Sequence, residues 1–169
     1  MLMNFYSVLY GLCLLLTGLS AGLFYSYQCS VIGGLGALPT REYLMSFQGI
    51  NKAILNPVFF ASFIGSLLVL VLAVLLVWYN NINYLLPYLV TALVIYALGV
   101  FTVTAAGNVP LNEALARLDL VHATETELEQ FRLKFEARWN RLNLVRTVAA
   151  ILAFGALIIP YIKKLAATT

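Results

Sequence analysis

The sequence predicts an all-α integral membrane protein, a four-helix bundle with amphipathic helical segments in the loops between spans 1 and 2 and between spans 3 and 4. Of its 169 residues, 62% are hydrophobic and only 10% are charged, and the mean hydropathy is +0.91, outside the usual range of soluble domains. No Asp, Glu, Lys or Arg occurs from Met1 to Thr40 or from Ala53 to Asn112. Uncharged runs of this length predict membrane-spanning helices, because lipid offers no partners to unpaired backbone amides. We therefore expect a single membrane domain over residues 1–169.

The hydrophobic parts of the sequence divide into four expected spans, and more polar connections join them. The expected spans cover about residues 5–28, 57–79, 85–106 and 143–162, and the polar helical loop covers residues 107–142. Only the tetrapeptide Asn80–Asn83 separates spans 2 and 3, which predicts an antiparallel hairpin. Asn56 followed by Pro57 predicts a helix cap with proline in the first turn, where its missing N–H costs nothing.

The first span contains Gly18 and Gly22, a Gly-x-x-x-Gly pair on one helix face. Such pairs let helices approach closely in membranes. Packing inside the chain's own bundle is the favoured interpretation, and a homo-oligomer interface through the Gly18/Gly22 face is the alternative.

The loop between spans 1 and 2 predicts a short amphipathic helix that begins near residues 39–42 and lies at the membrane interface. Its apolar side chains recur at helical spacing at Tyr43, Phe47, Ile50 and Ile54. Gln48 and Asn51 lie elsewhere on its surface. They either line a cavity or make simple hydrogen bonds to neighbouring loops.

The loop between spans 3 and 4 contains most of the charge. Glu113 and Arg117 are four residues apart, the spacing of an ion pair on a helix surface. Thr124 and Glu127 have the spacing of a capping box. The helix that starts there can continue to about Pro160, roughly 50 Å. It therefore either projects beyond the membrane or bends near Asn140.

The start of the fourth span combines apolar and polar side chains. Arg138 falls on an apolar seam that includes Phe135 and Leu142, so it needs a partner or a route to water. Trp139, Asn143 and Arg146 share a neighbouring face. Ionisable groups inside a span usually face a bundle interior, which makes Arg146 a site candidate, although it could also extend to the headgroups. We expect these residues and the third-span residues Asn108 and Asn112 to converge on one polar pocket.

Several segments together resemble the anthrone oxygenase-like family of small four-helix membrane proteins. The matching segments are Gly22–Tyr25, Ile50–Pro57, Asn108–Asn112, Phe135–Trp139, Asn143 and Arg146–Thr147. The chain departs from the family pattern at Ile32–Leu35, where a proline would be expected before the glycine. The resemblance implies oxidation of an anthrone to an anthraquinone without a known metal or flavin.

This chemistry needs an apolar slot, a base, and donors for a developing oxyanion. The base candidates near the polar segments are Glu113 and His122. The expected substrate-binding residues are Asn108, Asn112, Arg138, Trp139, Asn143, Arg146, Asn51 and Tyr25, with Phe24 as a further aromatic residue. A single histidine excludes a multi-histidine metal site within one chain, so we expect no metal and no cofactor.

The alternative function is a non-enzymatic membrane protein that binds a lipid, a quinone or a protein partner through the polar loops. The chain has a net charge of +3, and its acidic and basic residues are interleaved, so its charge gives no indication of nucleic-acid binding. Eight of ten basic residues lie in the two polar loops, which places these loops in the cytoplasm by the positive-inside rule. We expect a bacterial inner (plasma) membrane, with membrane lipid and a small aromatic substrate as partners.

Overall fold

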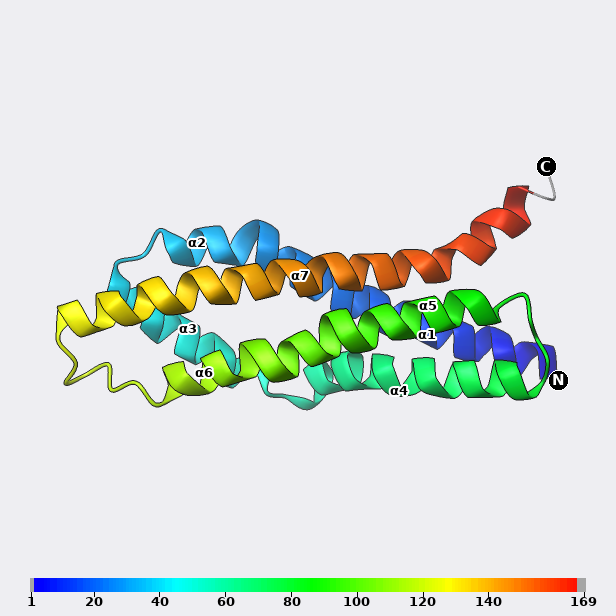
Figure 1. The fold of residues 1–169 in the computed structure, drawn as a ribbon, viewed down its shortest axis with the longest axis horizontal. Coiled ribbons are helices and arrows are strands. Elements are labelled where there is room, and N and C mark those ends of the chain that lie inside the picture. The colour runs from blue at the N-terminus through cyan, green and yellow to red at the C-terminus, as the bar shows by residue number, and fades with distance from the viewer. Residues whose placement is uncertain (1, 167–169) are drawn as a thin grey trace.

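The computed structural model describes residues 2–166, which form helices joined by short loops (Figure 1). Its elements are α1 (Leu2–Ser26), the π-helical η1 (Tyr27–Val31), α2 (Ile32–Gly36), α3 (Thr40–Ile54), α4 (Pro57–Tyr79), α5 (Leu86–Ile95), the π-helical η2 (Tyr96–Thr102) and η3 (Thr104–Asn108), α6 (Val109–Ala116) and α7 (Glu125–Ala166). Four helices are long and apolar enough to cross a membrane. The predicted all-α membrane bundle is confirmed.

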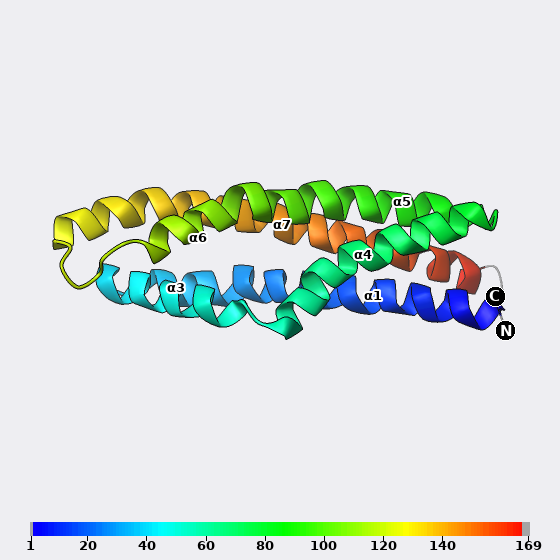
Figure 2. The same cartoon turned by 90° about the horizontal axis from the view of Figure 1, so that it is seen from below.

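The helices run along one long axis, with both described ends of the chain and the α4–α5 turn at the same end (Figures 1 and 2). Segments α1, η1 and α2 follow one another directly, as do η3 and α6. Helix α3 covers one half of the bundle and α4 the other. In the first half, α3 packs on α6 and α7, and in the second, α4 packs on α1 and α5.

The second span has the bounds that the sequence predicts, but the other three extend further. The candidate spans are Phe5–Gly36, Pro57–Tyr79, Leu86–Ala116 and Glu125–Lys163. The helical backbone continues past Gln28, the expected end of the first span, through Gly33 and Gly34 to Gly36. The segment 107–142 is mainly an extension of the third and fourth helices, interrupted only between α6 and α7. Helix α7 has 42 residues, about 63 Å, and no break near Asn140. It therefore projects beyond a hydrocarbon core of about 30 Å.

Local sequence signals set the predicted helix boundaries. The Asn56 side chain accepts a hydrogen bond from the Phe59 amide (3.0 Å), which confirms the cap ahead of Pro57. The α4–α5 turn places Asn81 at a φ of 56°, a left-handed conformation that asparagine tolerates. Thr124 and Glu127 exchange backbone-to-side-chain hydrogen bonds of 2.8 and 3.3 Å, so the predicted capping box is also confirmed.

Two hydrophobic cores divide the molecule along its length. The larger core lies between α1, α4, α5, η2 and α7 and includes Tyr10, Leu70, Tyr96 and Leu157. The smaller core joins α2, α3, α6 and α7 and includes Tyr43, Phe47, Leu128, Phe135 and Trp139. Helix α3 is the short amphipathic helix expected between spans 1 and 2, and it packs its apolar face on α6 and α7.

Glycines permit close helix contacts at two crossings with α7. A Cβ atom at Gly18 would lie 3.1 Å from the Phe154 ring, so this face packs on the chain's own α7. That contact favours the intramolecular interpretation for Gly18. At Gly99, a Cβ atom would lie only 2.5 Å from the Ala149 Cβ atom, so the third and fourth spans depend on glycine here.

We expect Gly99→Ala to destabilise the protein by about 1–3 kcal/mol, because the added methyl group forces the third span away from Ala149. Unfolding by denaturant in detergent micelles measures this change. Gly11→Ala is the matched control, because no heavy atom lies within 4 Å of a Cβ atom there. Equal stability of the two variants would contradict a required close contact at Gly99.

Candidate functional site

Arg146 of α7 is a buried cation at the junction of the two cores. Its side chain is held without a carboxylate: Nε and Nη2 donate to the Asn143 Oδ1 atom at 3.0 and 2.9 Å. The guanidinium carbon lies 4.6 Å from the centre of the Phe24 ring and 4.9 Å from the Trp139 ring. Only 7% of the residue is exposed. Amide oxygens and aromatic faces therefore stabilise this charge inside the bundle.

Asn143 connects Arg146 to the first span. The residue is fully buried, and its Nδ2 atom donates to the Gln28 Oε1 atom at 2.9 Å. The Thr147 hydroxyl donates to the Asn143 carbonyl at 2.7 Å and lies 3.2 Å from the Phe24 carbonyl. These contacts fix the rotation of α7 against α1 and η1, and so fix the direction of the guanidinium.

Trp139 connects Arg146 to the third span. Its indole Nε1 donates to the Asn112 Oδ1 atom at 2.8 Å, and its carbonyl lies 3.5 Å from the Asn108 Nδ2 atom. Both asparagines therefore contact the residue whose ring lies against Arg146. We call Asn108, Asn112, Trp139, Asn143 and Arg146 the Arg146 cluster.

Buried polar atoms without partners lie in and near this cluster. In the described part of the chain, Asn108 Oδ1, Asn51 Nδ2 and the Tyr43 hydroxyl are buried and make no hydrogen bond. Such atoms are rare in folded proteins, and each calls for an explanation, such as a bound water or ion or a functional role. Asn108, which is fully buried, therefore offers an unused acceptor beside Trp139.

The sequence left two alternatives for Gln48, lining a cavity or hydrogen-bonding to neighbouring loops, and the structure shows hydrogen bonds of the second kind. Its Nε2 atom donates to the carbonyls of Leu115 and Leu118 at 2.7 and 3.3 Å. These bonds tie α3 to the end of α6. Asn51 lies about one helical turn further along α3 and keeps its unpaired Nδ2 atom.

Arg138 lies outside the Arg146 cluster, so the structure does not bring this expected substrate-binding residue together with the others. The residue is exposed, as is Val145, whereas Trp139, Asn143 and Arg146 are buried. The reason for this difference is that the surroundings of a membrane helix are lipid and not water. Lipid is as apolar as a protein core, so an apolar seam in a membrane helix does not distinguish the lipid-facing side from the packed side.

Tyr25 also lies outside the cluster, with 57% of its surface exposed. Its neighbours take the expected aromatic role: Phe24 lies against Arg146, and the Tyr27 ring centre lies 5.3 Å from that of Trp139. Sequence reasoning missed Tyr27 and Gln28. An amide in an otherwise apolar span is the signal that could have found Gln28.

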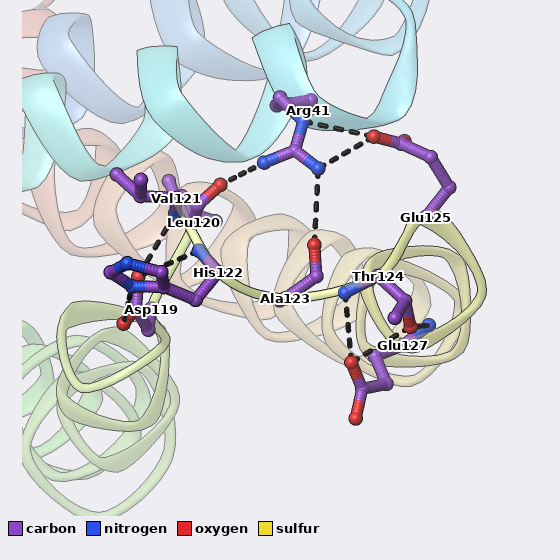
Figure 3. Close-up of polar contacts among 9 residues, drawn as sticks. All are labelled: Arg41, Asp119, Leu120, Val121, His122, Ala123, Thr124, Glu125 and Glu127. Atoms are coloured by element: carbon purple, nitrogen blue, oxygen red, sulfur yellow. Dashed lines mark hydrogen bonds and ion pairs between the residues drawn. The ribbon is translucent and has the colours of Figure 1, made fainter.

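The two base candidates are exposed, and each is hydrogen-bonded to a neighbouring side chain outside the Arg146 cluster. Glu113 forms the predicted pair with Arg117 at 3.3 Å. The His122 Nδ1 atom lies 2.7 Å from the Asp119 carboxylate (Figure 3). The His122 side chain, together with the amides of His122 and Val121, holds the pKa of Asp119 below its usual range. Within residues 2–166, no three His, Cys, Asp or Glu side chains come together as a metal site.

Two other arginines hold the polar end together. Arg41 of α3 pairs with Glu125 at 2.6 Å and donates to the carbonyls of Leu120 and Ala123, which anchors the α6–α7 loop (Figure 3). Arg132 pairs with Glu136 at 2.8 Å. It also donates to the carbonyls of Gly36 and Leu38 at 2.8 and 2.7 Å, at the end of α2. Both arginines therefore pair with a carboxylate, whereas Arg146 is held by an amide oxygen and two aromatic rings.

Comparison with known proteins identifies the family. The family model described as anthrone oxygenase matches residues 57–156, more than half of the chain. This range includes all five residues of the Arg146 cluster. No curated protein and no solved structure matches the chain. The chain belongs to the anthrone oxygenase family.

Proposed function

We propose that this protein is an oxygenase that converts a lipophilic, anthrone-type aromatic compound into a quinone, with the Arg146 guanidinium binding the substrate oxygen. The observation that carries the proposal is a buried cation without a carboxylate partner. In the described part of the chain, the Arg146 Nη1 atom has no hydrogen-bond acceptor. The family match supports the reaction class.

An arginine in this environment favours formation of an enolate. The methylene group of an anthrone is acidic, because loss of its proton gives an aromatic oxyanion. A guanidinium donor aimed at that oxygen stabilises the negative charge as it develops, and does so more strongly in a site with little water. The aromatic faces of Trp139 and Phe24 offer apolar surface for the fused rings.

The enolate then reacts with dioxygen in steps that balance. One electron passes to dioxygen, and the resulting radical pair combines to form a C–O bond, which gives a hydroperoxide after protonation. Loss of the remaining C–H proton and cleavage of the O–O bond release water and leave a second carbonyl. The methylene carbon is oxidised and dioxygen is reduced, so anthrone and dioxygen give anthraquinone and water.

Tyr27 is the proposed proton acceptor. Its ring packs on Trp139 from the side of η1, and its hydroxyl makes no hydrogen bond to the described residues. A phenolate there would take the methylene proton and return it to the peroxide oxygen. Glu113 and His122 are less suited, because each is exposed and paired at the polar end.

We expect Arg146→Gln to lower the rate of anthraquinone formation by about 10²–10³-fold, because one oxyanion donor is lost. The assay follows quinone absorbance in detergent-purified protein supplied with anthrone and air, with the spontaneous oxidation subtracted. Tyr27→Phe should also lose activity without a change in KM. The controls are Arg141→Gln, at an exposed arginine on α7, and Tyr25→Phe, at the exposed neighbouring tyrosine.

Two results would overturn this proposal. One is an Arg146→Gln variant that is folded, by circular dichroism and thermal unfolding, and as active as Arg141→Gln. The other is a wild-type protein that neither binds anthrone nor exceeds the spontaneous rate.

We also infer that the polar end of the bundle lies in the cytoplasm of the bacterial inner (plasma) membrane. The support is that eight of the ten basic residues lie on α3, at Arg117 after α6, or on α7 up to Arg146. In a variant with Cys13 and Cys29 replaced by serine, a cysteine at Asn81 should react with a membrane-impermeant maleimide in whole cells. A cysteine at His122 should react only after lysis. The reverse pattern would contradict this orientation.

A further inference from the structure

A cavity lies at the end of the bundle opposite the polar loops. At this end the described ends of the chain and the α4–α5 turn lie together (Figure 1). The volume of the cavity is about 790 Å³. Its most chemically distinctive lining residues are five tyrosines and one lysine, namely Tyr6, Tyr10, Tyr84, Tyr88, Tyr161 and Lys163. Several phenol hydroxyls and one ammonium group thus surround a space large enough for a small polar headgroup.

Lys163 gives this cavity a positive charge that no acidic residue offsets. Its Nζ atom donates to the Tyr88 hydroxyl at 2.7 Å and lies 5.4 Å from the centre of that ring, so its partner is neutral. All seven acidic residues of the chain lie between Glu42 and Glu136, on elements of the polar end or on the loop between them. An anion is therefore the complementary ligand.

An apolar groove continues from this cavity along the bundle. The groove, of about 600 Å³, lies between α1 and α7, and Tyr161 lines both spaces. Helix α1 contributes three leucines and Gly18 to its lining, and α7 contributes Phe154, Ile158 and Tyr161. From Tyr161 to Phe154 the groove follows α7 for about 10 Å. It offers no charged group, and it lies on helices that cross the membrane.

We propose that the cavity and the groove together bind one anionic phospholipid. The phosphate accepts hydrogen bonds from the Lys163 ammonium and from tyrosine hydroxyls, and one acyl chain lies in the groove against Gly18 and Phe154. The charge and the continuity of the two spaces favour a lipid over a free anion. No residue of the Arg146 cluster lines the cavity or the groove, so this site is separate from the proposed reaction at Arg146.

Native mass spectrometry of the full chain, released from detergent after incubation with equal amounts of phosphatidylglycerol and phosphatidylcholine, tests the site. We expect the wild-type protein to retain one phosphatidylglycerol in preference to phosphatidylcholine. Lys163→Gln should lower this preference about fivefold, the effect of one lysine near an anionic lipid surface. Lys163→Arg should keep it. Lys134→Gln, which removes an exposed lysine at the polar end, is the matched control and should leave it unchanged.

Three outcomes would overturn the proposal. The first is equal retention of the two lipids by the wild-type protein. The second is an unchanged preference in a Lys163→Gln variant with wild-type thermal stability. The third is displacement of phosphatidylglycerol by inorganic phosphate at matched ionic strength, which would identify the ligand as a free anion. The test measures retained lipid directly and does not depend on oxygenase activity, so this proposal and the proposed function can fail independently.

Discussion

A guanidinium buried among amides and aromatic rings, with no carboxylate beside it, is the interaction on which the arrangement of the polar half depends. A charge inside a membrane bundle is costly unless neighbouring groups hold it. Arg146 therefore requires the Asn143 oxygen, and Asn143 in turn uses Gln28 of the first span. The Trp139 ring on the other side is fixed by Asn112 of the third span. One side chain thus specifies how three spans meet.

The break between α3 and α4 gives the two halves of the bundle different surroundings. Because Asn56 and Pro57 end one helix and start the next, the charged residues of α3 lie in the polar half, while α4, which has no charged residue, lies in the other half. Arg41 and Arg132 then tie α3, α2 and the α6–α7 loop to α7. The opposite half has no acidic residue and ends in the tyrosine-lined cavity at Lys163. The two halves therefore suit different ligands. The polar half suits the proposed aromatic substrate at Arg146, and the cavity at Lys163 suits an anionic lipid.

The sequence was sufficient to predict features with local causes. The cap at Asn56 and the capping box of Thr124 and Glu127 depend on side chains within three residues, and both form as predicted. The pairing of Glu113 with Arg117 follows from helix geometry alone. The second span was predicted to the residue, because a proline and an asparagine-rich turn bound it.

The spacing of apolar residues could not predict features that depend on which side of a helix faces the bundle. Arg138 and Arg146 both follow apolar neighbours, yet only Arg146 is buried, because lipid and core select the same apolar side chains. For the same reason Tyr25 is exposed while Tyr27 packs on Trp139. The cavity at Lys163 joins residues from opposite ends of the chain, and no local pattern indicates such a meeting.

An experimental structure with bound anthraquinone tests most directly whether Arg146 holds the substrate oxygen. We expect a quinone oxygen about 2.7–3.1 Å from the Arg146 Nη1 atom, with the fused rings against Trp139. Anthraquinone bound instead in the cavity beside Lys163, with Arg146 contacting only Asn143 and the two aromatic rings, would contradict this role.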